Sequence, residues 1–473
     1  MTNREYDVIV IGAGAVGENI ADRAVQGGLS AVIVESELVG GDCSYWACMP
    51  SKALLRSGIA LRAAQKLKGA KEAVTGTLDA AEVFARRNSF THHWNDQSQV
   101  DWVAGAGIDL VRGHARFTAA KEVTVTAADG TVTVLTAHHA VAVSVGSDAL
   151  LPDIPGLKDA SPWTSRDATS AQEAPKRLAI IGGGVVATEM ATAYASFGTD
   201  VTLIARSTLL SGAEPFAGET LTDALRELGA TVKLGVSATS VTRDDDGVTL
   251  QLDDGGFVIA DEVLVATGRV PRTSDLGFDA IGLTPGDWLH TDDTLLVDGF
   301  DWFYACGDVN HRALLTHQGK YQARAAGDVI AARASGKTVD DAPWGAHVAT
   351  ADHAAVPQVT FTDPEVASVG LTAAQAQKAG YDIRVIDYDL GSVAGAALHA
   401  DGYAGQARMV VDESRKVILG VTLVGQDVAE LIHAATVAVV GEVSLDRLWH
   451  AVPSYPTMSE IWLRLLESYG RPS

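Results

Sequence analysis

Two stretches of the chain share one order of apolar and polar positions, in which a short apolar run leads through a glycine-rich turn into a longer segment typical of a helix. The first occupies residues 6–24, YDVIVIGAGAVGENIADRA, and the second occupies residues 177–198. A further apolar run follows each of them, at 31–35 and at 200–206. Short apolar runs bounded by glycine predict buried strands, so each stretch predicts the strand, helix and second strand of a dinucleotide-binding unit.

The rest of the pattern predicts the domain boundaries. Pro50 is predicted to open a helix, and the alternation EVTVTAADGTVTVL predicts a hairpin about a DG turn. The proline-punctuated LPDIPG marks a boundary near residue 151, and after about residue 345 strand-like segments precede an apolar helix and a proline-broken tail. We therefore predict an α/β fold with two Rossmann-like dinucleotide-binding domains and a C-terminal α+β domain. The predicted segments are residues 1–150, 151–272, 273–345 and 346–473.

The composition is that of a large acidic globular protein. A length of 473 residues suggests about three domains, and the net charge of −23 repels nucleic acid and anionic lipid headgroups. The N-terminal residues contain no apolar leader, and no run of 18 apolar residues occurs. We therefore expect a cytoplasmic protein with no nucleic-acid partner and no membrane association. Only three cysteines occur, which excludes a structural disulfide framework.

The first glycine motif consists of Gly12, Gly14 and Gly17 at the start of a predicted helix. Such a turn lets backbone N–H groups meet a pyrophosphate, although glycines also serve plain turns between a strand and a helix. Glu35 follows Gly12 by 23 residues, where an acid suits a ribose hydroxyl, and this spacing favours a bound dinucleotide.

The second motif places Gly182, Gly184 and Ala187 at the three small positions. The same spacing from Gly182 reaches Ala205 instead of an acid, and Arg206 follows it. A missing carboxylate and an adjacent arginine favour a 2′-phosphate, so we expect NADPH, with NADH possible. If Arg206 is only a solvated surface residue, the preference for NADPH over NADH would be weak.

Two cysteines stand close together in GGDCSYWACMPSK. Cys43 and Cys48 precede the helix that Pro50 is predicted to open. The positive end of that helix and the nearby Lys52 are expected to lower the pKa of a thiol and produce an attacking thiolate. The pair could also be half of a zinc site, but zinc needs four ligands and the chain has no second pair. We therefore predict no metal site.

These motifs, in this order, resemble the class I pyridine nucleotide-disulfide oxidoreductase family, which includes glutathione reductase, dihydrolipoamide dehydrogenase and mercuric reductase. The resemblance covers essentially the whole chain and also rests on ATGR at 266–269, on the ACGD turn ending at Asp308 and on YPTMSE near the C-terminus. It implies an FAD-binding domain made of segments 1–150 and 273–345. The segment 151–272 would be an inserted NAD(P)H-binding domain, and the last segment a dimerisation domain.

By this resemblance Cys43 and Cys48 form the redox-active pair, with Cys48 against the flavin and Cys43 exchanging with substrate. Lys52 would lie near the reactive edge of the flavin, with Glu189 as its ion-pair partner. Cys306, alone in ACGD, is expected to be a small buried side chain. The residues assigned to cofactors are Gly12, Gly14, Gly17, Glu35, Lys52 and Asp308 for FAD, Gly182, Gly184, Ala187 and Arg206 for NADPH, and Gly268 and Arg269 for a bound nucleotide.

The C-terminal motif departs from the thiol-disulfide members of the family. They carry a histidine followed five residues later by glutamate, and here these positions are Tyr455 and Glu460. An imidazole can accept a thiol proton at neutral pH, whereas a phenol with a pKa of about 10 donates one. Turnover of dihydrolipoamide or glutathione is therefore disfavoured. His450 lies five residues upstream and is the alternative proton acceptor, or else it has a surface or packing role.

The sequence thus predicts an FAD-dependent NADPH:acceptor oxidoreductase, a homodimer whose small-molecule electron acceptor is a disulfide, a quinone or a metal ion. GGGVVATE is most similar to mercuric reductase, but the chain has no cysteines near its C-terminus to deliver mercury. One alternative is dihydrolipoamide dehydrogenase, using NAD within a 2-oxoacid dehydrogenase complex. Another is a flavin reductase in which the cysteines are auxiliary. An idle FAD-binding redox sensor or scaffold is the alternative from a different class.

Overall fold

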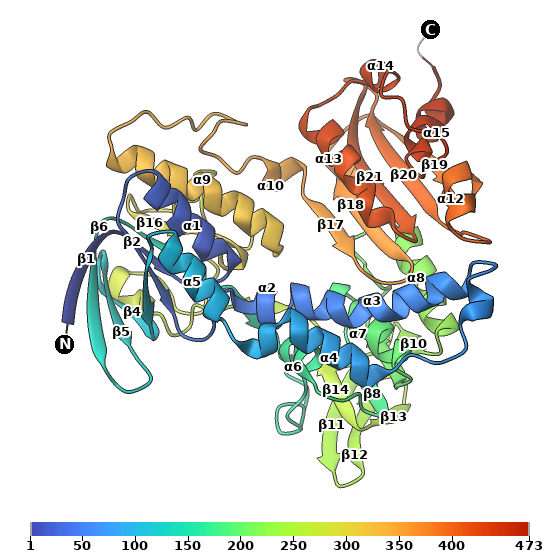
Figure 1. The fold of residues 1–473 in the computed structure, drawn as a ribbon, viewed down its shortest axis with the longest axis horizontal. Helices are drawn as coiled ribbons and strands as arrows, with labels where there is room; N and C mark the ends of the chain where they lie inside the picture. The colour runs from blue at the N-terminus through green and yellow to red at the C-terminus, as the bar shows by residue number, and fades with distance from the viewer. Residues whose placement is uncertain (1, 472–473) are drawn as a thin grey trace. The chain divides into compact units, whose positions relative to one another are not determined.

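The structure is a computed structural model that describes residues 2–471 and separates into two compact units (Figure 1). The first unit contains the residues up to Pro50, Asn88–Leu150 and Gly268–His353. The second contains Ser51–Arg87, Leu151–Thr267 and the residues from Ala354 onward. This grouping rests on compactness, and the four segment boundaries expected from the sequence remain predictions. Some boundaries between these segments fall inside a helix. The helices concerned are α3 (Cys48–Gln65), α4 (Ala80–Phe90) and α10 (Ala351–Ala354).

The first unit is built on a sheet with the strand order β3-β2-β1-β6-β5-β4, to which β16 adds beside β6. The strands around β1 run parallel, whereas β4, β5 and β6 are antiparallel, as the predicted hairpin requires. The strands are β1 (Thr2–Ile11), β2 (Ala31–Glu35), β3 (Asp109–Arg112), β4 (His114–Ala119), β5 (Glu122–Thr126), β6 (Val132–Val143) and β16 (Phe303–Ala305), with a separate pair β7 (Ser147–Ala149) and β15 (Arg269–Pro271). The helices are α1 (Ala15–Gln26), α2 (Gly41–Tyr45), α5 (Gln97–Gly105) and α9 (Thr316–Ala334).

Helices α1 and α9 pack against each other through small residues. A Cβ on Gly319 would lie 2.6 Å from Val16 Cγ2, and a Cβ on Gly27 would lie 2.4 Å from the Ala331 Cβ. Glycine at these positions therefore lets the two helix backbones approach closely. As a result, the start of α9 lies beside the start of α1, where the first glycine motif ends.

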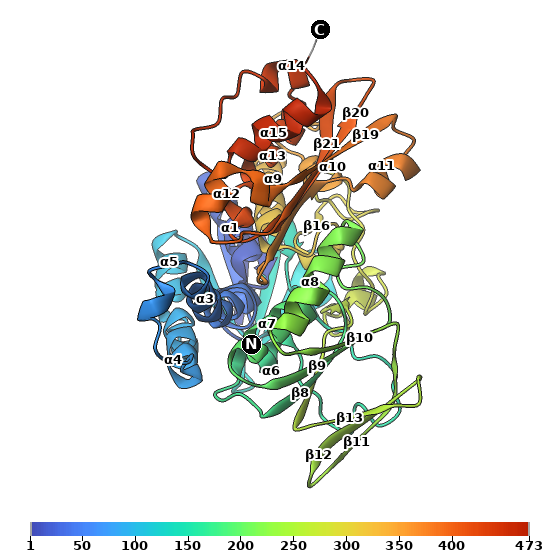
Figure 2. The ribbon, with the colours of Figure 1, turned by 90° about the vertical axis from the view of Figure 1, so that its right-hand side faces the viewer.

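The second unit contains a parallel sheet and two antiparallel sheets. The parallel sheet has the order β10-β9-β8-β14, and the larger antiparallel sheet has the order β17-β18-β21-β20-β19. Figure 2 labels β8, β9 and β10 of the first sheet and β19, β20 and β21 of the second. All nine residues of β21 are buried, and α13 packs on this strand. The strands are β8 (Arg177–Ile181), β9 (Asp200–Ala205), β10 (Thr231–Leu234), β11 (Ala238–Asp244), β12 (Gly247–Leu252), β13 (Phe257–Ala260), β14 (Glu262–Val265), β17 (Pro357–Thr360), β18 (Glu365–Gly370), β19 (Ile383–Asp389), β20 (Gln406–Asp412) and β21 (Val417–Gly425). The helices are α6 (Ser165–Ser170), α7 (Val185–Ser196), α8 (Pro215–Glu227), α11 (Ala373–Lys378), α12 (Ala394–His399), α13 (Ile432–Val440), α14 (Leu445–Leu448) and α15 (Glu460–Tyr469).

The predicted fold class is confirmed, because each glycine motif joins a parallel strand to a helix and the C-terminal residues form an α+β layer. Two local expectations are corrected. Helix α3 begins at Cys48 and not at Pro50, since proline is tolerated anywhere in a first turn whose N–H groups have no helical partner. The proline-broken tail also ends in a helix, α15, whose buried residues include Ile461 and Leu465. No helix of the described residues is long and apolar enough to cross a membrane.

Candidate active site

The two thiols of the first unit are hydrogen bonded to each other. Cys43 lies in α2 and Cys48 is the first residue of α3, and both are half-buried. Thr316, the first residue of α9, places its Oγ1 3.2 Å from Cys48 Sγ. Lys320 follows Thr316 by one helical turn. The pair therefore has a hydroxyl partner and a nearby ammonium group on one helix.

The Cys43 thiol is not acidified within the pair. Its pKa is raised, first by the hydrogen bond with Cys48 and then by burial and by the charge of Cys48. The hydrogen bond with Thr316 and the positive charge of Lys320 oppose this rise. Since two neighbouring thiols share one proton when one of them ionises, Cys43 holds that proton, and exchange at Cys43 requires a group that takes it.

A segment around residues 94–99 holds α2 in place. Trp94 Nε1 donates to the Tyr45 carbonyl at 3.2 Å, and Asp96 Oδ2 accepts from Val39 N at 2.7 Å. The Tyr45 hydroxyl donates to Gln99 Oε1 at 3.0 Å. No spacing in the sequence predicts these contacts, because they join residues about 50 positions apart.

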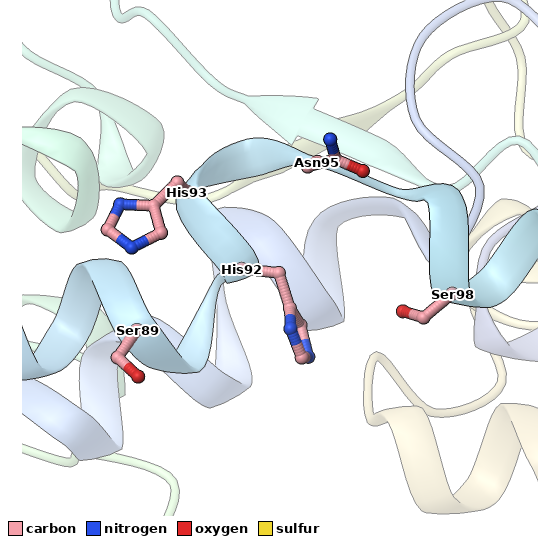
Figure 3. Close-up of a pocket in the computed structure, with 5 residues that line it drawn as sticks. All are labelled: Ser89, His92, His93, Asn95 and Ser98. Atoms are coloured by element: carbon pink, nitrogen blue, oxygen red, sulfur yellow. The ribbon is translucent and has the colours of Figure 1, made fainter.

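The same segment borders a hollow of about 410 Å³ lined by Ser89, His92, His93, Asn95 and Ser98 (Figure 3). The two imidazole rings point in different directions, so their nitrogens do not converge on one point. Among residues 2–471, no group of three or more His, Cys, Asp or Glu side chains is placed to hold a metal ion.

The first glycine motif is shaped for a dinucleotide. Gly12 has φ +98°, and a Cβ on Gly17 would lie 1.9 Å from the Gly12 carbonyl oxygen, so both positions need glycine. Glu35, at the end of β2, accepts a hydrogen bond from Ala13 N at 2.7 Å, and burial raises the pKa of this carboxyl. A carboxylate has about four acceptor positions, so Glu35 retains capacity for ribose hydroxyls. These residues fit an FAD molecule.

Asp308 begins a short 3₁₀ turn and lies in a polar cluster. Its carboxylate accepts from the Ser147 hydroxyl and lies 3.6 Å from Arg269. Arg269 is also 3.9 Å from Asp42, the neighbour of Cys43 in the chain, and Arg272 is 3.3 Å from the same carboxylate. Two predicted cofactor residues, Asp308 and Arg269, are thus brought together, and Ser147 is a contact that the sequence did not reveal.

The ion pair expected between Lys52 and Glu189 is present in the second unit. Lys52 Nζ lies 2.9 Å from Glu189 Oε2, and Glu189 Oε1 accepts from Phe361 N at 3.0 Å. The Lys52 ammonium also lies 4.9 Å from the centre of the Phe361 ring. Glu189 is only 3% exposed, and both of its carboxylate oxygens have hydrogen-bond partners, as a buried carboxylate requires. The place of this pair beside a flavin remains a prediction.

The second glycine motif presents an open backbone. A Cβ on Gly182 would lie 2.2 Å from the Ala266 carbonyl oxygen, whereas nothing lies within 4 Å of a Cβ on Gly184. Gly184 precedes α7, and Ala187 is fully buried within that helix. Arg206 directly follows β9 with an exposed side chain, and no ion pair is found for it among the described residues.

The residues of the C-terminal motif differ in exposure. Tyr455 is 75% exposed and His450 is also exposed, whereas Glu460 is 5% exposed. Glu460 Oε1 pairs with Arg464 at 2.5 Å, but its Oε2 is buried without a hydrogen-bond partner. Cys306 is fully buried, as expected, and burial raises the pKa of its thiol.

Sequence reasoning missed Thr316 and Lys320, which contact or influence the thiol pair from α9. The available signal was weak: a threonine that follows two leucines eight residues after Asp308, at a possible helix start. The glycine turns, the acid at the end of β2 and the thiol pair together define a class of protein, the flavin- and pyridine-nucleotide-dependent oxidoreductases.

Residues 6–332 match the family described as pyridine nucleotide-disulphide oxidoreductase, and residues 356–465 match its dimerisation domain. The chain therefore belongs to the pyridine nucleotide-disulfide oxidoreductase family, whose members are FAD-dependent enzymes that use NAD(P)H. It is 30% identical to a mercuric reductase of Staphylococcus aureus, over 96% of this chain and 81% of the relative. It is 32% identical to a dihydrolipoyl dehydrogenase of Halobacterium salinarum, over 98% and 95%. The Cu(II) complex of the HOCl-induced flavoprotein disulfide reductase RclA from Escherichia coli has the same fold, with a TM-score of 0.84, 22% identity and coverage of 98% and 99%.

Proposed function

We propose that this enzyme is an NADPH-dependent reductase of a small electrophilic acceptor and that it works through FAD and the Cys43–Cys48 pair. The observation that carries the proposal is the hydrogen-bonded thiol pair with Thr316 at the start of α9. Both thiols are half-buried, each lies on a helix, and the Thr316 hydroxyl contacts one of them. This arrangement suits reversible disulfide formation and not a structural cross-link.

FAD would be held by the turn from Gly12 to Gly17, by Glu35 and by the cluster around Asp308. Bound FAD would take a hydride from the nicotinamide and pass an electron pair to the disulfide. The chain's own part is to keep the reduced pair as one thiolate and one thiol, with the proton on Cys43. Cys43 then reacts with the acceptor once that proton has been removed.

The acceptor is proposed to be a small disulfide, a quinone or a metal ion. Tyr455 stands where a proton-accepting histidine would serve thiol-disulfide exchange, and a phenol donates a proton at neutral pH. This favours acceptors that gain a proton from the enzyme. Dihydrolipoamide oxidation, the activity named for one relative, requires the opposite direction of proton transfer.

We also propose that NADPH is preferred over NADH, because the exposed Arg206 follows β9 where an acid would otherwise bind the ribose. A homodimer is proposed from the dimerisation domain and from apolar side chains exposed on it, which include Val452 at 84% and Val437 at 56%. Tyr455 would complete the site of the partner subunit. A reducing cytoplasm suits a chain whose three cysteines include a catalytic pair.

Anaerobic titration of the FAD-loaded protein with NADPH and with NADH tests the proposal. We expect NADPH to bleach the flavin and to produce a long-wavelength absorbance band that Cys48→Ser abolishes. Absence of bleaching would support an idle FAD-binding sensor or scaffold. If dihydrolipoamide reduces the flavin faster than NADPH does, and NAD then accepts the electrons, dihydrolipoamide dehydrogenase would be supported instead.

A screen of disulfides, quinones, metal ions and dioxygen identifies the acceptor class. Turnover should fall in Cys43→Ala and persist in the matched variant Cys306→Ala, because Cys306 is sealed in the core. Unchanged turnover in Cys43→Ala would show that the flavin reduces the acceptor directly and that the cysteines are auxiliary.

A further inference from the structure

A buried side-chain amide joins the turn before Asp308 to helix α9. Gln322 Oε1 accepts from Gly307 N at 2.8 Å, and Gln322 Nε2 donates to Asp352 Oδ2 at 2.8 Å. The same oxygen also accepts from Asn310 Nδ2 at 2.9 Å. Only one orientation of this amide places its oxygen toward the Gly307 N–H and its nitrogen toward the carboxylate. Gln322 is fully buried, so removing its amide would leave buried polar groups without partners.

Two further donors hold the Asp352 carboxylate in place. Arg312 Nε donates to Asp352 Oδ2 at 2.9 Å, and Gln318 Nε2 donates to Asp352 Oδ1 at 2.8 Å. The side chain of Asp352 is 1% exposed and that of Arg312 is 11% exposed, so the two charges form a buried ion pair. Asp352 therefore presents a fixed acceptor to Gln322 and keeps the Gln322 amide in its orientation. All of these residues belong to the first unit.

The conformation of Gly307 explains why the turn needs this support. Gly307 has φ +79°, and a Cβ there would lie 3.2 Å from Val16 Cγ2 of α1. Glycine permits this backbone and this close approach, but it also leaves the free turn many other conformations. The hydrogen bond with Gln322 limits that freedom in the residue directly before Asp308. The Asp308 carboxylate is held on its other side, because it accepts from the Ser147 hydroxyl.

Gln322 also lies on the helix that contacts the thiol pair. Thr316 is the first residue of α9, and its Oγ1 lies 3.2 Å from Cys48 Sγ. Gln322 follows Thr316 within two turns of that helix, so the helix backbone fixes the distance between these two residues. One short helical segment therefore connects the turn that carries Asp308 with the thiol pair.

We propose that Gln322 is a positioning residue, which preorganises the Gly307–Asp308 turn for FAD and keeps that turn at a fixed distance from Cys48. This inference rests on the proposed function, in which Asp308 contacts the cofactor. A turn that is already held in its binding conformation loses less conformational entropy when the ligand binds. Asp352 acts one step further away, by orienting the Gln322 amide.

The affinity of the FAD-free protein for FAD tests this assignment. Gln322→Met keeps the length of the side chain and removes both of its hydrogen-bonding groups. Gln318→Met is the matched control, because Gln318 is also buried on α9 and donates to Asp352, whereas the Gly307 N–H is bonded to Gln322. Quenching of FAD fluorescence measures the Kd. We expect Gln322→Met to raise this Kd about tenfold or more and Gln318→Met to change it by less than about twofold, although both lower the free energy of unfolding.

The absorbance of the reduced, FAD-saturated protein separates positioning from a loss of stability. The long-wavelength band between the flavin and Cys48 depends on their distance, so it should weaken in Gln322→Met and keep its wild-type intensity in Gln318→Met. If the two variants share one FAD affinity and one band intensity, Gln322 is only a packing residue and the inference is overturned.

Hydrogen exchange in the FAD-free wild-type protein gives a test that needs no variant. The Gly307 amide should be protected, because its N–H is bonded to a buried side chain. Exchange of the peptide that contains Gly307 at the rate of an unstructured chain would also overturn the inference. The proposed function is tested separately, since it would be contradicted if the wild-type protein failed to bind FAD or if NADPH failed to reduce the bound flavin.

Discussion

At the scale of single residues, the distribution of one proton governs the thiol pair. The hydrogen bond with Cys48 raises the pKa of Cys43, so Cys43 is the thiol that keeps its hydrogen. Cys48 Sγ lies 3.2 Å from the Thr316 hydroxyl oxygen. Any acceptor that reacts at Cys43 therefore depends on a nearby group of suitable pKa, and the identity of that group selects the chemistry.

Replacing Tyr455 tests this selection. Tyr455→His supplies an imidazole, so thiol-disulfide turnover with a small disulfide should rise by about tenfold or more. Steady-state kcat/KM for that disulfide at neutral pH is the measurement. Tyr455→Phe is the control, since it removes the phenol without adding a base. Equal effects of the two substitutions would argue that residue 455 takes no part in proton transfer.

Arg206 is expected to set the nucleotide preference. Arg206→Ala should raise KM for NADPH about tenfold and leave KM for NADH within about twofold, because only NADPH carries the 2′-phosphate. Arg226→Ala, at an exposed position of α8, should change neither value. A parallel loss with both nucleotides would mean that Arg206 supports the fold of the domain and not the choice of cofactor.

The sequence predicted those site residues that stand at a fixed spacing from a glycine motif. Glu35 lies 23 residues after Gly12 and Asp308 directly follows Gly307, and both accept hydrogen bonds in the first unit. The Lys52–Glu189 pair was expected from the family resemblance, and the two side chains do meet. Thr316 and Lys320 could not be predicted, because their relation to the thiols arises from helix packing between distant parts of the chain.

At the scale of elements, the close packing of α1 and α9 determines how the site is assembled. Small residues let α9 begin directly beside the turn that carries the first glycine motif. The sequence predicted α1 from its glycines, but it gave no indication that a later helix would return to the same turn. The start of α3 at Cys48 was also placed two residues too late, since Pro50 marks a first turn without fixing its first residue.

Gly319 is the element-scale test. Gly319→Ala would place a methyl group 2.6 Å from Val16, and we expect it to lower the free energy of unfolding by about 1–3 kcal/mol. Chemical denaturation measures this change. Gly105→Ala in α5 meets nothing within 4 Å and should be neutral, or should stabilise by up to about 1 kcal/mol. Equal stability of the two variants would contradict the close approach of α1 and α9.

At the scale of the whole molecule, acidic charge and exposed apolar side chains have opposite effects on the association of two copies of the chain. A net charge of −23 makes two copies of the chain repel each other. The C-terminal α+β layer nevertheless exposes Val437, Val452 and Tyr455. The sequence predicted this layer from the strand-like segments and the apolar helix after about residue 345, whereas the exposure of these three side chains required the structure.

Val452→Asp should weaken self-association at least about tenfold, because it adds a charge to an apolar contact. Sedimentation velocity over a range of protein concentrations measures the change. Phe257→Asp, at a 62% exposed position of β13, is the control and should associate normally. Added salt should tighten the dimer by screening the acidic charge. A fully active monomer would remove the proposed role of the partner's Tyr455.

The burial of Cys306 has a practical consequence for work in living cells. Of the three cysteines, Cys306 is sealed in the core, and burial raises the pKa of its thiol. A thiol reagent added to the native protein should therefore count only Cys43 and Cys48. Those two thiols react with the label when they are reduced and not when they form a disulfide. The mass that the label adds would therefore show what fraction of the enzyme carries the reduced pair, even in an unfractionated extract.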